Sequence, residues 1–229
     1  ARALARAEAL RPFDFARGPL VRAQVYRLES REHWLLATTH HIVSDGWSMS
    51  VIVRELGALY AALCAGGVAA LPALPVQYAD YARWQREWLR GAVLERKVAF
   101  WREHLADVPP LDLPADFARP AVLSGRGDRV PFALSRATLD ALNGVARERG
   151  ATPFMVLLAA FAAWLRRETG QDDLVIGTSV ANRQRRELEP LVGFFVNTLA
   201  LRVRTDDELP LADLVARTKE ICLGAYAHQ

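Results

Sequence analysis

The residues with the clearest potential for chemistry lie in the segment THHIVSDGWS, residues 39–48. Two adjacent histidines, His40 and His41, are followed after three residues by Asp45 and Gly46. A neutral imidazole can accept a proton or a hydrogen bond from an attacking nucleophile, and a glycine leaves room for a substrate or a backbone to approach. The pattern predicts acid–base chemistry, and a histidine satisfied within the core is the structural alternative.

The predicted elements on either side of this segment would hold it in place. Alternating apolar and polar residues predict strands over residues 20–28 and 33–41, and apolar residues at helical spacing predict a helix over 47–64. Because side chains alternate across a strand, His40 and His41 are expected to point to opposite faces. Two diverging histidines without an HxxxH or CxxC pattern also predict that no metal is bound.

The rest of the chain alternates helices with strands, which predicts an α/β fold. The end of a helix is expected over 1–10, and further helices within 76–105 with a break near Gly91, at 136–149, from residue 153 and at 211–226. Strands are expected at 129–134, 173–180 and 194–204. The helix that begins at Pro153 is apolar nearly all round and is expected to be buried. Pro- and Gly-rich residues over 108–127 predict a connector between two lobes.

Composition narrows the class of protein. The chain has 229 residues, 52% of them hydrophobic, with a net charge of +3. The arginines are spread along the chain, and the run at 183–186 is read as a solvated loop, so a nucleic-acid partner is not expected. The two cysteines show no ligand spacing, no signal peptide is recognisable, and the longest apolar stretch is too short for a bilayer. These features predict a cytoplasmic protein without a membrane partner.

Several segments together resemble the condensation domains of nonribosomal peptide synthetases. The histidine segment resembles their HHxxxDG signature, and the other matching segments follow in order along almost the whole chain. They are RPFDFARGPLVRA (11–23), YADYARWQREWL (78–89), LDLPADFARP (111–120), VIGTSVANRQRRELEPLVGFFVNTLALR (175–202) and AYAHQ at the end. The resemblance implies a two-lobed fold similar to chloramphenicol acetyltransferase, truncated at both ends. It assigns residues 1–112 to the N-terminal lobe, 113–127 to the linker and 128–229 to the first part of the C-terminal lobe.

The same resemblance implies the reaction and its partners. The amine of an acceptor aminoacyl thioester attacks a donor thioester to form an amide, and both are carried on 4'-phosphopantetheine arms. These arms belong to upstream and downstream peptidyl carrier domains, beside an adenylation domain, and the domain binds no cofactor itself. His41 is implied to be catalytic, with His40 facing the lobe core. Asp45 is implied to be structural, in a salt bridge with Arg183 from the other lobe.

Other residues have less specific expectations. Trp47 and Ser48 could line the acceptor side, or Trp47 could pack between the lobes, and Asn197 could hydrogen-bond near the cleft or only satisfy the backbone. Trp84 and Trp88 are read as core residues rather than as a stack for a ligand. Among related functions, an epimerisation domain shares HHxxxDG, but VGFFVNTLALR favours condensation. A heterocyclisation domain would have aspartates in place of the histidines, and a plant-type acyltransferase would carry DFGWG. A non-catalytic platform that binds a carrier protein or another enzyme is the alternative from a different class.

Overall fold

The computed structural model describes residues 1–118, 120–122, 124–125, 127–206 and 208–229. The chain divides into two compact units, and each is described by itself. The first unit comprises residues 1–89 and 181–197, and the second comprises 90–180 and 198–229. This division differs from the predicted lobes, since it places 90–112 in the second unit and 181–197 in the first. The assignment of lobes and linker stays a prediction, and Arg119, Leu123 and Arg126 of the predicted linker lie outside the described residues.

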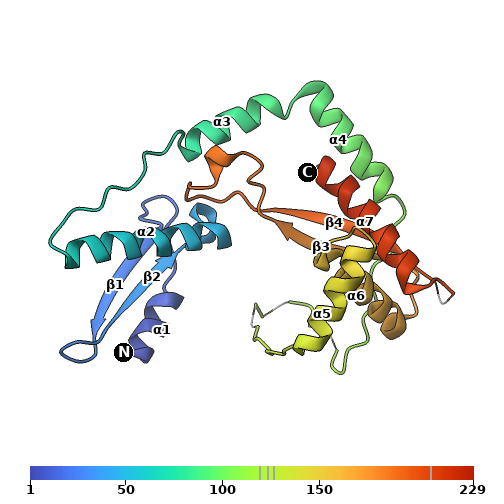
Figure 1. Cartoon of the computed structure of the whole chain (residues 1–229), viewed down its shortest axis with the longest axis horizontal. Helices are drawn as coiled ribbons and strands as arrows, with labels where there is room; N and C mark the ends of the chain where they lie inside the picture. The colour runs from blue at the N-terminus through green and yellow to red at the C-terminus, as the bar shows by residue number, and fades with distance from the viewer. Residues whose placement is uncertain (119, 123, 126, 207) are drawn as a thin grey trace. The chain divides into compact units, whose positions relative to one another are not determined.

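The first unit begins with a helix and a β-hairpin (Figure 1). Helix α1 spans Arg2–Leu10, and strands β1 (Val21–Arg27) and β2 (His33–Thr39) pair antiparallel, with Val21 opposite Thr39 and Arg27 opposite His33. The Arg22 guanidinium joins α1 to the hairpin: its Nε lies 2.5 Å from Glu8 Oε1, and both side chains are largely buried. An ion pair therefore holds the first helix against β1.

The second strand ends two residues earlier than predicted. His40 is still extended and its N–H donates to the carbonyl of Leu20, but residues His41–Val43 form a short 3-10 turn. The turn forms because His40 Nδ1 accepts from the N–H of Ile42, which caps it. The prediction of opposite faces assumed a strand through His41, so that argument does not apply to this residue.

The helices of the first unit follow the prediction closely. Helix α2 spans Gly46–Cys64 with Asp45 as its N-cap, and α3 spans Tyr78–Trp88, where Asp80 Oδ2 accepts from the N–H of Gln77. Residues 181–197 return to this unit as a loop with one 3-10 turn, η2 (Arg186–Leu188). Within the described chain, α2 alone has the length and apolar composition of a membrane-crossing helix, which is weak evidence, and the absence of a membrane partner stays a prediction.

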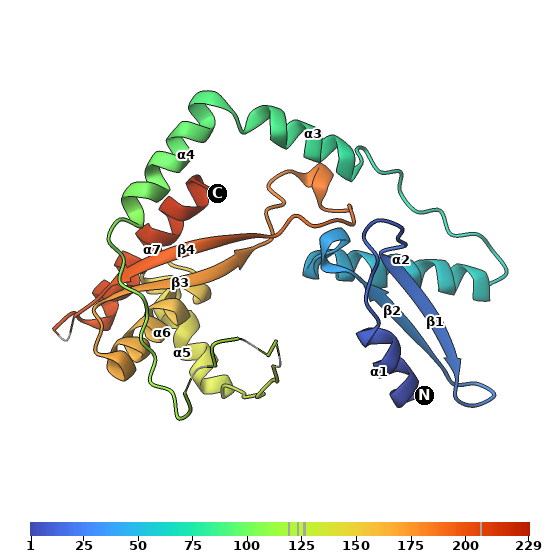
Figure 2. The ribbon, with the colours of Figure 1, turned by 180° about the vertical axis from the view of Figure 1, so that it is seen from behind.

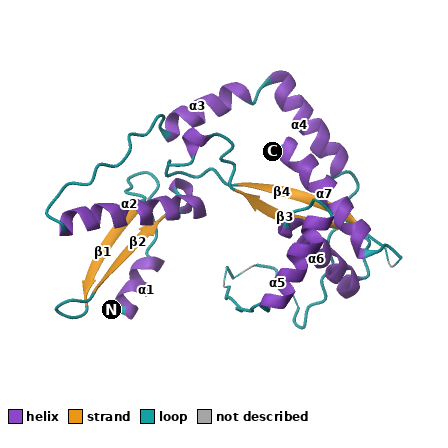
Figure 3. Cartoon of the chain, viewed as in Figure 1, coloured by secondary structure: helices purple, strands orange, loops and turns teal. Residues whose placement is uncertain are grey.

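The second unit is a helix-covered pair of strands (Figures 2 and 3). Its elements are α4 (Gly91–His104), α5 (Arg136–Glu148), α6 (Pro153–Thr169), β3 (Asp173–Val180), β4 (Asn197–Arg204, from Thr198 within this unit) and α7 (Leu211–Ala227). Strand β3 is hydrogen-bonded to β4. Apolar side chains of α6 and α7 pack with those of the strands, and buried members include Ala159, Leu201, Val203 and Val215. These residues form the larger core of the chain.

Two predictions for the second unit are wrong. Residues 129–134 form no strand: Val130 and Phe132 are almost fully exposed, and no described strand pairs with their backbone groups. Helix α6 is not buried all round either. One stripe of it is 39–51% exposed, at Phe154, Leu157, Phe161 and Trp164. This face has no covering element among the described residues, although the opposite face lies in the core.

Candidate functional site

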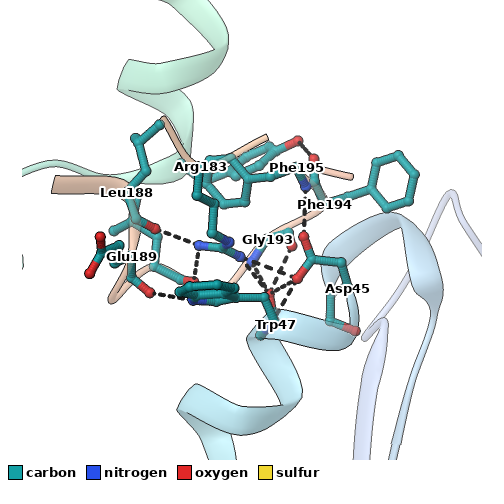
Figure 4. Close-up of polar contacts among 12 residues, drawn as sticks. Asp45, Trp47, Arg183, Leu188, Glu189, Gly193, Phe194 and Phe195 are labelled. Atoms are coloured by element: carbon teal, nitrogen blue, oxygen red, sulfur yellow. Dashed lines mark hydrogen bonds and ion pairs between the residues drawn. The ribbon is translucent and has the colours of Figure 1, made fainter. Parts of the chain in front are cut away.

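The Asp45 carboxylate is the centre of a buried polar cluster in the first unit (Figure 4). Its Oδ1 accepts from the N–H of Ser48 at 2.8 Å and from the Ser48 hydroxyl at 2.7 Å. Its Oδ2 accepts from the N–H of Phe195 at 3.0 Å. Both oxygens are thus occupied within the protein, which suits a structural carboxylate and not a group that exchanges protons with a substrate.

Arg183 lies beside Asp45, as the sequence predicts. Its Nη2 is 3.2 Å from Asp45 Oδ1, and the two side chains are only 1% and 3% exposed. The other nitrogen, Nη1, donates to the carbonyls of Leu188 and Leu191, and the guanidinium lies 4.0 Å from the centre of the Phe195 ring. Both partners belong to the first compact unit, so the expectation that Arg183 reaches Asp45 from another lobe is not met. The arginine instead fastens the 183–195 loop to the start of α2.

The pKa of Asp45 lies below its ordinary value. Burial alone would raise it, but the hydrogen bonds from Ser48, the N–H of Phe195 and the positive charge of Arg183 together lower it further. The side chain is therefore an anion at neutral pH, which the ion pair requires.

Ser48 is completely buried, so the prediction that it lines a substrate path is wrong. Its hydroxyl oxygen accepts from the N–H of Gly193 and from Arg183 Nη2, both at 3.0 Å. The hydroxyl hydrogen has two acceptors in reach, Asp45 Oδ1 and the carbonyl of Gly193. Ser48 therefore joins the first turn of α2 to the segment before β4.

The two histidines hold opposite tautomers. Nδ1 of His40 accepts from a backbone N–H, so this nitrogen carries no hydrogen. Nδ1 of His41 lies 2.7 Å from the carbonyl of Ser44, and because a carbonyl only accepts, this nitrogen carries the hydrogen. A neutral His41 consequently has its lone pair on Nε2. The rings also have different surroundings: His40 is partly buried against the edges of Phe13 and Phe15, whereas His41 is exposed and meets Phe194.

Three residues close to His41 were not predicted as site residues: Tyr78, Gly193 and Phe194. The Tyr78 hydroxyl donates to the carbonyl of Phe194 at 2.7 Å. A Cβ added to Gly193 would lie 2.2 Å from the Tyr78 ring, so only glycine fits beside it. The sequence signal for them is the GFF segment, which the family resemblance matched as a block without assigning roles to its members.

The other predicted residues lie as follows. Gly46 is exposed, and an added Cβ would meet no atom within 4 Å. The Trp47 indole N–H donates to the carbonyl of Glu189 at 2.9 Å, and the ring borders a cavity of about 450 Å³. Asn197 is the exposed first residue of β4. Whether these three meet a substrate stays a prediction.

The Trp84 and Trp88 rings stack on one another and are 37% and 42% exposed, so their assignment to the core is wrong. Across the described part of the chain, no three His, Cys, Asp or Glu side chains gather as metal ligands would. The prediction of a site without metal remains a prediction.

Comparison with known proteins identifies the family. The family model of the condensation domain matches residues 1–229. A linear gramicidin synthase of Brevibacillus parabrevis is 48% identical over 99% of this chain, which covers 3% of that protein. The phosphinothricin tripeptide synthetase PhsC of Streptomyces viridochromogenes is 47% identical over 96% of the chain, which covers 20% of its length. The chain therefore spans a small part of these relatives.

Solved structures agree in fold. An X-domain from teicoplanin biosynthesis, in complex with OxyB, has a TM-score of 0.89 and 32% identity, and the match covers 99% of this chain and 51% of that one. The first condensation domain of the calcium-dependent antibiotic synthetase, in complex with a substrate analogue, has a TM-score of 0.79 and 25% identity over 99% and 51% of the two chains. The chain belongs to the condensation domain family of nonribosomal peptide synthetases and spans about half of such a domain.

Proposed function

We propose that this chain supplies the catalytic histidine of a condensation domain that joins two carrier-bound thioesters through an amide bond. The observation that carries the proposal is the state of His41. Its ring is exposed, its Nδ1–H is bound to Ser44, and its Nε2 is left as an acceptor. His40 lacks this combination, because its Nδ1 is used to cap the turn.

The reaction needs a modest contribution from the imidazole. A free α-amino group has a pKa of about 7.7 to 8.0, so a useful fraction is neutral near pH 7. Its nitrogen attacks the thioester carbonyl, the N–C bond forms and the C–S bond breaks. His41 Nε2 accepts the proton that the amine loses, and the departing thiolate is protonated to the thiol. General-base help of this kind gives about 10² to 10⁴-fold, and orientation of the amine adds to it.

The partners follow from the family. Peptidyl carrier domains would deliver the donor and the acceptor on phosphopantetheine arms, beside an adenylation domain, in the cytoplasm. The similarity to a four-domain nonribosomal peptide synthetase, with a TM-score of 0.85 and 26% identity, supports this setting. No cofactor bound by the domain itself is proposed.

The test uses a complete condensation domain that contains these residues. Carrier domains loaded with donor and acceptor thioesters are mixed with it, and amide formation is followed by mass spectrometry. We expect His41→Ala to abolish the product without lowering the melting temperature. We expect His40→Ala mainly to destabilise the fold, because the His40 ring caps the turn and packs on Phe13 and Phe15. A folded but inactive His40 variant beside an active His41 variant would reverse the assignment.

A second candidate function is a platform that binds another protein without catalysis. The similarity to an X-domain in complex with OxyB favours it. The same experiment separates the two, since a platform forms no amide and its partner binding survives His41→Ala. Chiral analysis of the donor thioester would detect epimerisation, the remaining alternative.

A further inference from the structure

A single hydrogen bond does not fix the direction of the His41 ring. The bond from Nδ1–H to the Ser44 carbonyl lies within the ring's own turn, and the imidazole can swing about it. The second contact is the Phe194 ring, which meets the imidazole edge to face with centroids 5.2 Å apart and an interplanar angle of 84°. The direction of Nε2 therefore depends on where Phe194 is held.

Phe194 is held by side chains from two helices. The residue before it, Gly193, is bound through its N–H, which donates to the Ser48 hydroxyl. The carbonyl of Phe194 itself accepts from the Tyr78 hydroxyl, and the next N–H, of Phe195, donates to Asp45. Three consecutive residues of an otherwise irregular segment are thus clamped, from the start of α2 and the start of α3.

Tyr78 is the member of this clamp that binds Phe194 directly. Its ring lies against Gly193 and meets the Phe195 ring with centroids 5.1 Å apart, so the hydroxyl has a defined position. Burial, with a smaller contribution from the Asp45 charge, raises the pKa of the Tyr78 hydroxyl above its ordinary value. The hydroxyl therefore remains a hydrogen-bond donor throughout the range in which the domain would work.

We infer that Tyr78 and Phe194 are positioning residues for His41: the Tyr78 hydroxyl fixes the Phe194 backbone, and the Phe194 ring fixes the imidazole. This inference rests on the proposed function of His41. It assigns to the GFF segment and to the first residue of α3 a role in aiming Nε2 at the attacking amine.

The experiment compares Phe194→Leu, Phe194→Tyr and Tyr78→Phe in the complete domain, in the assay of amide formation. Phe194→Leu removes the ring edge, and we expect kcat to fall about 10²-fold, as small displacements of a catalytic group do, with little change in KM. Phe194→Tyr keeps the edge and should restore most of the turnover. Tyr78→Phe removes one hydrogen bond and should lower kcat up to about tenfold. The matched control is Tyr60→Phe, at an exposed position of α2.

A second measurement separates positioning from a loss of fold. The ¹⁵N signals of the His41 ring report its tautomer and its mobility. In Phe194→Leu we expect these signals to broaden or to move toward a mixture of tautomers, with the melting temperature nearly unchanged. In Tyr60→Phe they should stay as in the parent domain.

The outcomes distinguish this inference from the function it rests on. If His41→Ala is inactive while Phe194→Leu and Tyr78→Phe keep full turnover and unchanged ring signals, the positioning role is overturned and the catalytic role stands. If His41→Ala retains full turnover, the proposed function fails, and the positioning role fails with it. A loss of kcat together with altered ring signals in Phe194→Leu supports both.

Discussion

At the residue scale, the pair of Asp45 and Arg183 decides whether the site has a fixed geometry. Each side chain is almost fully buried, and each also binds backbone groups: Asp45 the N–H of Phe195, and Arg183 two carbonyls of its own loop. A buried charge that loses its partner cannot be rescued by water. The pair is thus more costly to break than its distance of 3.2 Å suggests.

We expect Asp45→Ala and Arg183→Ala each to lower the free energy of unfolding by about 3 to 5 kcal/mol, since each leaves one uncompensated charge. The double variant should lose much less than the sum, because the second change removes the charge that the first one left unpaired. Chemical unfolding of the complete domain and of the three variants measures this. Additive losses would mean that the two residues do not interact.

At the element scale, the segment before β4 shows why a strand starts where it does. Apolar residues predict a strand from Phe194, but β4 begins at Asn197. The backbone groups of 193–195 are bound by side chains of Ser48, Tyr78 and Asp45, so they are not available to a neighbouring strand. The same reason ends β2 at Thr39, where the His40 ring begins to cap a turn.

Gly193 gives the second test of this arrangement. In Gly193→Ala the new Cβ would lie 2.2 Å from the Tyr78 ring, which has to move. We expect a loss of about 1 to 3 kcal/mol in unfolding free energy, as for other overpacked sites, together with a loss of amide formation. Gly57→Ala is the matched control. Gly57 lies inside α2 with no atom near an added Cβ, so alanine should raise stability by up to about 1 kcal/mol. Equal stabilities of the two variants, measured by thermal unfolding, would contradict the tight contact.

Much of the fold can be predicted from local patterns, and the site only in part. Helix starts are set by nearby residues, so the caps at Asp45, Ser135 and Thr152 predict α2, α5 and α6 well. The contact of Asp45 with Arg183 joins residues far apart in the sequence and was accessible only through the family resemblance. The role of Ser48 was missed because its burial depends on Gly193, and periodicity carries no information about that contact.

At the scale of the whole molecule, the two compact units have unequal cores. Among the described buried apolar residues, only Val51, Tyr81, Leu188, Leu191 and Phe195 belong to the first unit, and the rest lie in the second. The β1–β2 hairpin of the first unit is a two-stranded sheet, which has little stability by itself, and it exposes Val21, Val25 and Leu35. Helices α6 and α7 of the second unit share two buried clusters.

This difference predicts how the 229-residue chain opens. Amide exchange is governed by local unfolding, whose free energy rises with the buried apolar contacts that must be broken. We therefore expect exchange in β1 and β2 to be much faster than in α6 and α7, when peptides of the chain are followed by mass spectrometry in deuterated buffer. In a complete condensation domain, which is about twice as long as this chain, the hairpin should gain protection more than α7 does, because the hairpin has more apolar surface left to cover. Equal protection of the hairpin and α7 in the isolated chain would show that the small cluster around Phe195 stabilises the first unit as strongly as the larger core stabilises the second.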